Sequence, residues 1–131
     1  MQLNETGTMA VQTSRMIRNV FGDRIDGLGI YDIVEEPNHR AFKIDYLVYD
    51  FAGVRFIYEN DLFEIHLLLN LNKEKVISKT NSHYSKISDW DSYLKEIMLD
   101  IESYIPEKFL KAKGWYKRRG ILQCLKVKWI F

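Results

Sequence analysis

The first apolar positions of the chain recur at helical spacing. Steps of three and four residues join the members of one face, as expected of a helix that buries one side. These positions are Thr13, Met16, Ile17, Val20 and Phe21. Gly22 follows directly, and glycine is common just after the end of a helix. We therefore predict an N-terminal helix that stops at Gly22, preceded by a frayed stretch over residues 1–7.

From residue 29 the apolar period changes to two, the repeat of a strand with one buried face. The runs with this alternation cover residues 31–34, 42–48, 54–59 and 62–71. Turn-forming residues separate them, as in the sequence Glu-Glu-Pro-Asn-His of residues 35–39. Strands joined by short turns pair antiparallel, so the pattern predicts a β-meander. We expect a further short strand through Val76 and Ile77, then a loop over residues 81–87.

A second helical pattern lies after the meander. The sequence Ser-Asp-Trp-Asp of residues 88–91 has the form of a capping box at a helix start. The apolar residues that follow at helical steps are Trp90, Leu94, Ile97, Met98, Ile101 and Ile105. Pro106 suits the first turn of a further short helix, which Gly114 would end. From Leu125 to Phe131 apolar and polar residues alternate again, which predicts a closing strand.

Together these elements predict an α+β fold. A mostly antiparallel sheet is flanked by an N-terminal helix and a C-terminal helical segment, with a closing C-terminal strand. The chain has 131 residues, and no repeat or Pro/Gly/Ser-rich linker divides it. We therefore expect residues 1–131 to form a single α+β domain.

The near-neutral charge of the chain hides an asymmetry. The formal net charge is +1, but residues 1–105 carry eleven basic and seventeen acidic side chains, whereas residues 106–131 carry eight and one. The single cysteine, Cys124, excludes an internal disulfide and fits a reducing compartment. The sequence shows neither a secretory leader nor an apolar run long enough to cross a bilayer. We expect a soluble, cytoplasmic protein that does not bind a membrane.

No motif points to a cofactor or a metal. His39, His66 and His83 are scattered, and no HExxH, CxxC or EF-hand spacing occurs. The Gly27-Leu28-Gly29 sequence precedes a strand, so it cannot present helix N-terminal amides to a phosphate. No serine lies in a GxSxG elbow. We expect no cofactor, no metal site and no catalytic residue, and hence a protein that is not an enzyme.

One pair of residues keeps an enzymatic alternative open. Glu64 and His66 share a face of the predicted strand 62–71, so Glu64 could orient His66 as a general base. The more ordinary interpretation is a solvated sheet face on which charged residues form cross-strand pairs.

The C-terminal basic cluster supports a nucleic-acid-binding alternative. Its residues for contacts with phosphates and bases are Lys113, Trp115, Lys117, Arg118 and Arg119. Basic side chains interleaved with aromatic rings are typical of surfaces that bind a nucleic-acid backbone and stack on bases. The ordinary alternative is a solvated turn with Trp115 packed in the core.

Acidic residues around the meander suggest contact with a basic partner. The candidate partner-binding residues are Asp32, Glu35, Glu36, Tyr46, Tyr58, Glu59, Asp61 and Glu64. Carboxylates held on a rigid sheet can imitate phosphates and speed the encounter with a basic cleft. Tyrosine is enriched among interface hot spots, although at least half of the candidate tyrosines Tyr31, Tyr46, Tyr49 and Tyr58 should lie in the core.

The chain also resembles a group of known proteins over residues 29–115. The resemblance rests on residues 54–59, 62–71 and 90–115, which include the sequence Ile-Pro-Glu-Lys-Phe-Leu. In these stretches the chain is similar to the small immunity proteins that bacteria encode beside polymorphic or contact-dependent toxins. The resemblance implies a non-catalytic protein that binds one cognate toxin domain, often a nuclease, and blocks its active site. The near-neutral charge differs from the strongly acidic pattern of several nuclease inhibitors.

Three hypotheses follow in order of preference. The first is an immunity or inhibitor protein that binds a toxin domain. The second is a nucleic-acid-binding accessory protein, and the third is a small enzyme that uses Glu64 and His66.

Overall fold

The structure, a computed structural model, describes residues 4–70 and 73–112. Contacts divide the chain into two compact units, Met1–Ile101 and Glu102–Phe131. The first unit contains an N-terminal helix, an antiparallel sheet and a second helix, so the predicted α+β class is confirmed. The single domain over residues 1–131 stays a prediction. None of the described helices is long and apolar enough to cross a membrane.

The sheet is the predicted meander. Its strands are β1 (Ile25–Glu36), β2 (His39–Val48), β3 (Ala52–Glu59), β4 (Leu62–Asn70) and β5 (Lys73–Val76), hydrogen-bonded in that order. Every adjacent pair is antiparallel. The two-residue strand β6 (Ser82–His83) pairs with β4, and a 3-10 turn over Tyr84–Lys86 follows it. The stretch 81–87, predicted as a loop, therefore contains short regular structure.

Tight turns set the register of the meander. Asn60 and Asp61 join β3 to β4, and both have a positive φ, of 47° and 71°. Two such residues in a two-residue hairpin loop match the right-handed twist of the flanking strands, and Asn and Asp tolerate this conformation. Because the turn adds no residue to either strand, Glu59 lies directly opposite Leu62.

The N-terminal helix α1 spans Glu5–Phe21. The Asn4 side chain caps it by accepting a hydrogen bond from the Gly7 backbone N–H at 2.6 Å. Residues 4–7 are thus part of an ordered helix start, whereas the sequence predicts fraying there. The predicted stop is confirmed, since Gly22 has a φ of 57° and donates its N–H to the Arg18 carbonyl.

The second helix, α2, spans Trp90–Glu102. Asp89 supplies the cap, because its carboxylate accepts hydrogen bonds from the backbone N–H and the hydroxyl of Ser92. The predicted apolar stripe is buried at Leu94, Ile97 and Ile101. In the second unit, the short helix α3 spans Glu107–Ala112 and begins just after Pro106, as predicted. The predicted closing strand lies outside the described residues.

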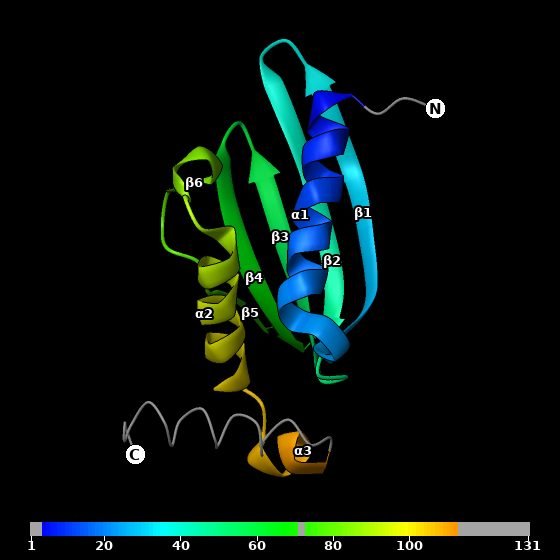
Figure 1. Cartoon of the computed structure of the whole chain (residues 1–131), viewed down its shortest axis with the longest axis vertical. Coiled ribbons are helices and arrows are strands. Elements are labelled where there is room, and N and C mark those ends of the chain that lie inside the picture. The colour runs from blue at the N-terminus through cyan, green and yellow to red at the C-terminus, as the bar shows by residue number, and fades with distance from the viewer. Residues whose placement is uncertain (1–3, 71–72, 113–131) are drawn as a thin grey trace. The chain divides into compact units, whose positions relative to one another are not determined.

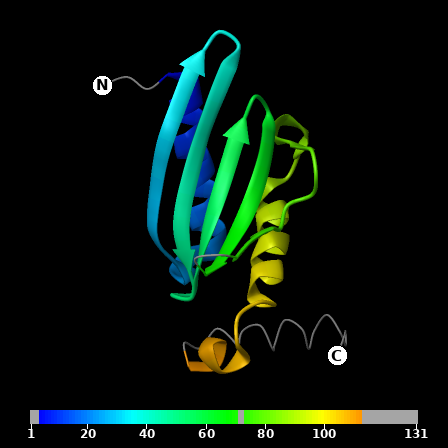
Figure 2. The ribbon, with the colours of Figure 1, turned by 180° about the vertical axis from the view of Figure 1, so that it is seen from behind.

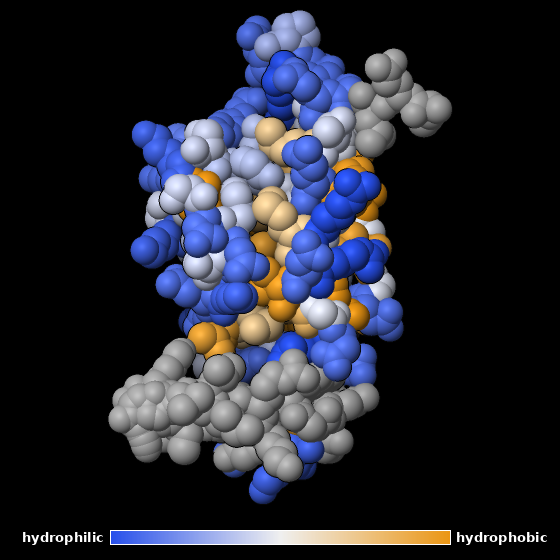
Figure 3. All heavy atoms as spheres, viewed as in Figure 1, coloured by the Kyte–Doolittle hydropathy of each residue, from blue (hydrophilic) through white to orange (hydrophobic). Residues whose placement is uncertain are grey.

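Both helices of the first unit cover the same face of the sheet (Figure 1). On that face the apolar members of β2, β3 and β4 form the core: Phe42, Ile44, Tyr46, Val48, Val54, Phe56, Tyr58, Phe63, Ile65 and Leu67. Aromatic rings from β3, β4, the 3-10 turn and α2 pack together, with Phe63 and Trp90 5.0 Å apart between centroids. Some apolar surface shows between α1 and α2, flanked by polar residues (Figure 3).

Candidate functional site

The opposite face of the sheet carries no described helix (Figure 2). We call this surface the open face and define it by the side chains that alternate with the core. Cross-strand register places rows of residues on it, such as Tyr31, Lys43, Ile57 and Glu64. Next to that row lie Asp45, Arg55, His66 and Val76.

The open face is acidic. Strands β1 to β5 place on it the carboxylates of Asp26, Asp32, Glu36, Asp45, Glu59, Glu64 and Glu74 and the cations Lys43 and Arg55. With histidine neutral, these seven carboxylates and two cations give a net charge of −5. The face also exposes large apolar side chains, with Leu47 49%, Leu62 41% and Val76 47% exposed. Carboxylates around accessible apolar surface resemble the make-up of a protein-binding surface.

Asp45 organises the centre of the open face. Its carboxylate accepts hydrogen bonds from Arg55 Nε at 2.9 Å and Nη2 at 3.1 Å, and from the Tyr31 hydroxyl at 3.0 Å. The bonds to Asp45 raise the pKa of the Arg55 guanidinium above its usual value. Partial burial, and then the Asp45 carboxylate, raises the pKa of Tyr31. The bidentate ion pair of Asp45 with Arg55 and the hydrogen bond from Tyr31 thus link side chains of three neighbouring strands.

His66 lies between two carboxylates. Its Nε2 pairs with Glu64 at 2.8 Å, its Nδ1 forms a short contact with Glu74, and its side chain is 12% exposed. Sequence reasoning found Glu64 but missed Glu74, which reaches His66 from β5 because residue 74 lies opposite Leu68. Both ring nitrogens are engaged, so neither is left to take a proton from a substrate. This geometry favours a structural role for His66 over the predicted general base.

Because His66 contacts two carboxylates, the free energy of unfolding should fall as the pH rises through the pKa of this histidine. Burial lowers the pKa of His66, but the hydrogen bonds and charges of Glu64 and Glu74 outweigh it and raise the pKa above its ordinary value. The protonated ring thus stabilises the fold below about 6.5, and this contribution is lost as pH rises through the raised pKa. Urea unfolding at a series of pH values should show the decline, and His66→Gln should flatten it. An unchanged slope in His66→Gln would assign the decline to another group.

Two hollows lie side by side at one end of the open face. The first, of about 380 Å³, is lined by Ile57, Glu59, Asn60, Leu62, Phe63 and Glu64. The second, of about 480 Å³, includes Asp32, Ile33, Val34, His39, Ala41 and Lys43 in its wall. Ile57 and Glu59 border both hollows. The predicted partner-binding residues Asp32, Glu36, Glu59 and Glu64 therefore share the open face, and three of them line its hollows.

Glu35 and Asp61 have different surroundings from the other predicted acids. Glu35 Oε1 accepts hydrogen bonds from the Thr6 backbone N–H at 2.9 Å and the Thr6 hydroxyl at 2.7 Å, so it ties β1 to the start of α1. These bonds lower the pKa of Glu35. Asp61 accepts hydrogen bonds from the backbone N–H and the hydroxyl of Ser85, which holds the 3-10 turn. Both carboxylates are engaged within the fold.

The tyrosine predictions need correction. Tyr46 and Tyr58, predicted as partner-binding residues, are 2% and 5% exposed and lie in the core. They belong to the apolar set of β2 and β3, on the face that the helices cover. Burial raises the pKa of Tyr46. Of the candidate tyrosines, Tyr49 is also buried, and Tyr31 is the one on the open face.

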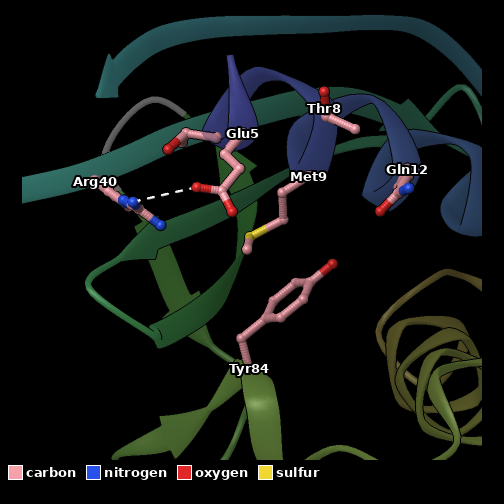
Figure 4. Close-up of a pocket in the computed structure, with 7 residues that line it drawn as sticks. Glu5, Thr8, Met9, Gln12, Arg40 and Tyr84 are labelled. Carbon is pink, nitrogen blue, oxygen red and sulfur yellow. Dashed lines mark ion pairs between the residues drawn. The ribbon is translucent and has the colours of Figure 1, made fainter. Parts of the chain in front are cut away.

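A further hollow lies on the helix side, beside the start of α1 (Figure 4). Its volume is about 420 Å³, and Glu5, Thr8, Met9, Gln12, Arg40 and Tyr84 are among the residues that line it. Arg40 pairs with Glu5 at 3.3 Å and with Glu35 at 2.9 Å. Arg40, the cation among the described residues that line this hollow, is therefore already paired with two carboxylates of the fold. We place the candidate site on the open face instead.

The described residues hold neither a cluster of metal ligands nor the basic cluster of the nucleic-acid alternative. No group of three His, Cys, Asp or Glu side chains among these residues is arranged to hold a metal ion. The basic cluster that carries the nucleic-acid alternative (Lys113, Trp115, Lys117, Arg118 and Arg119) lies outside the described residues.

Comparison of the chain with protein-family models, curated proteins and solved structures gave no match.

Proposed function

We propose that the chain is a non-catalytic binding protein that docks a protein with a basic surface on its open face. The observation that carries the proposal is the combination of a net charge of −5 with exposed apolar side chains on a face that no described helix covers. A basic partner gains electrostatic attraction during encounter, and the apolar residues then supply contact area.

A toxin domain fits this proposal. The resemblance to immunity proteins supplies that class of partner, and a nuclease has the basic cleft that an acidic face complements. Inhibition then means that the open face covers the cleft of the toxin, so the binder needs no chemistry of its own. The engagement of both His66 nitrogens by carboxylates supports the non-catalytic proposal.

Two matched variants test the proposal in a nuclease-treated native lysate. Glu59→Lys reverses an exposed charge on the open face, whereas Glu96→Lys reverses an exposed charge on α2. We expect wild type and Glu96→Lys to retain a common basic protein and Glu59→Lys to lose it. Capture by itself does not support the proposal, because only the difference between the variants reports on the face. Retention by all three baits, or recovery of an acidic partner, would contradict it.

A further inference from the structure

The hollow between β3 and β4, which we call the Leu62 hollow, combines an apolar surface with two carboxylates. Ile57 and Leu62 line it, and Leu62 is 41% exposed although it occupies a strand position. Glu59 and Glu64 line the same hollow. The register pairs Glu59 with Leu62 and Ile57 with Glu64, so the two glutamates are diagonal neighbours on one face. Diagonal neighbours of this kind lie about 7–8 Å apart.

Each glutamate has one oxygen held and one available. Glu59 Oε2 contacts His39 Nε2 at 2.7 Å, and Glu64 Oε1 contacts His66 Nε2 at 2.8 Å. The histidines thus fix the direction of both carboxylates. No hydrogen bond from the described residues reaches Glu59 Oε1 or Glu64 Oε2.

Among the described residues, no lysine or arginine lines this hollow. The neighbouring hollow differs, because Lys43 lines it and pairs with Asp32 at 3.4 Å. A cation is already present there, so of these two hollows the Leu62 hollow is the one that no described lysine or arginine lines.

We infer that the Leu62 hollow receives an arginine side chain of the partner. This inference rests on the proposed function and names the group that the open face recognises. The aliphatic stem lies over Ile57 and Leu62, and the guanidinium donates to the available oxygens of Glu59 and Glu64. Arginine fits better than lysine, because its planar fork carries five donors that can bond two separate carboxylates while its stem covers apolar surface.

A small probe tests the inference without the partner. N-acetyl-arginine amide is titrated into the full chain, and the methyl NMR signals of Ile57 and Leu62 are followed. N-acetyl-citrulline amide serves as the matched ligand, since it keeps the shape of arginine and lacks the charge. We expect saturable shifts of both methyl groups with the arginine derivative and much smaller ones with the citrulline derivative.

Matched variants locate the binding. Glu59→Gln combined with Glu64→Gln should weaken binding of the arginine derivative by about fivefold, since each exposed charge pair contributes modestly. Asp91→Asn combined with Glu96→Gln removes two exposed carboxylates from α2 and should leave the affinity unchanged. Equal shifts with both ligands, or equal weakening by both double variants, would overturn the inference.

The outcomes separate this inference from the proposed function. If a basic protein binds the open face while the Ile57 and Leu62 methyl groups do not respond to the arginine derivative, the proposed function stands and the arginine receptor is wrong. If the arginine derivative binds as expected but no basic protein is lost with Glu59→Lys, the receptor stands and the proposed function is wrong.

Discussion

Replacing Phe63 by alanine is expected to lower the free energy of unfolding by about 3–5 kcal/mol. The Phe63 side chain is 2% exposed, and its ring centroid lies 5.5 Å from Phe56, 5.0 Å from Trp90 and 5.6 Å from Tyr93. The substitution removes the central ring of this cluster and leaves a cavity between the sheet and α2. Urea unfolding of the full chain measures the loss.

The adjacent residue provides the control for that measurement. Leu62 is next to Phe63 in β4 but points to the open face and is 41% exposed. Leu62→Ala should therefore cost about 1 kcal/mol or less, because it opens no cavity. Similar costs for Phe63→Ala and Leu62→Ala would contradict the assignment of the two faces of β4.

The core could be predicted from the sequence because one rule fixes it. Side chains alternate across a strand, so Val54, Phe56 and Tyr58 had to share a face once strand β3 was identified. The same rule places Tyr46 in the core, since it alternates in step with Ile44 and Val48. Tyrosine remained ambiguous because its ring suits a core and its hydroxyl suits a surface.

The site could be predicted in part. Alternation placed Glu64 and His66 on one face, but Glu74 reaches them through a hairpin whose register the local pattern does not set. Asp61 and Glu35 lie within the meander in sequence, so the sequence pattern groups them with the other acids. Their partners are Ser85 and Thr6, 24 and 29 residues away, and no local pattern predicts contacts at such separations.

These two contacts determine which carboxylates can report on binding. Neutralising Glu35 or Asp61 would disturb α1 or the 3-10 turn, so a change in affinity could not be assigned to charge. Both carboxylates have a lowered pKa, so their contribution to stability is present above their unfolded pKa and is lost as pH falls through the folded value. Glu36, Glu59 and Glu64 are exposed and lie on the open face, so their charges can be removed with less effect on the fold.

Neutralising those three glutamates to glutamine is expected to slow association with the basic partner about tenfold and to flatten its dependence on salt. Charges on the surface act mainly on the rate of encounter, which salt screens over about 10 Å. The control variant carries Asp23→Asn, Asp91→Asn and Glu96→Gln, which remove exposed carboxylates outside the open face. It loses the same formal charge, so a general effect of net charge would slow both variants equally.

The same measurement tests the nucleic-acid alternative. If the partner is a nucleic acid, replacing Lys117, Arg118 and Arg119 should weaken binding steeply, and the salt slope should fall by about 0.9 for every duplex phosphate that the variant no longer neutralises. Removing acidic charge from the open face would then leave binding unchanged or strengthen it, because fewer carboxylates would repel the phosphates. A basic protein partner is supported if the glutamine variant associates more slowly and the C-terminal replacements leave binding unchanged. The reverse pattern supports a nucleic acid, and indifference to both changes contradicts both electrostatic hypotheses.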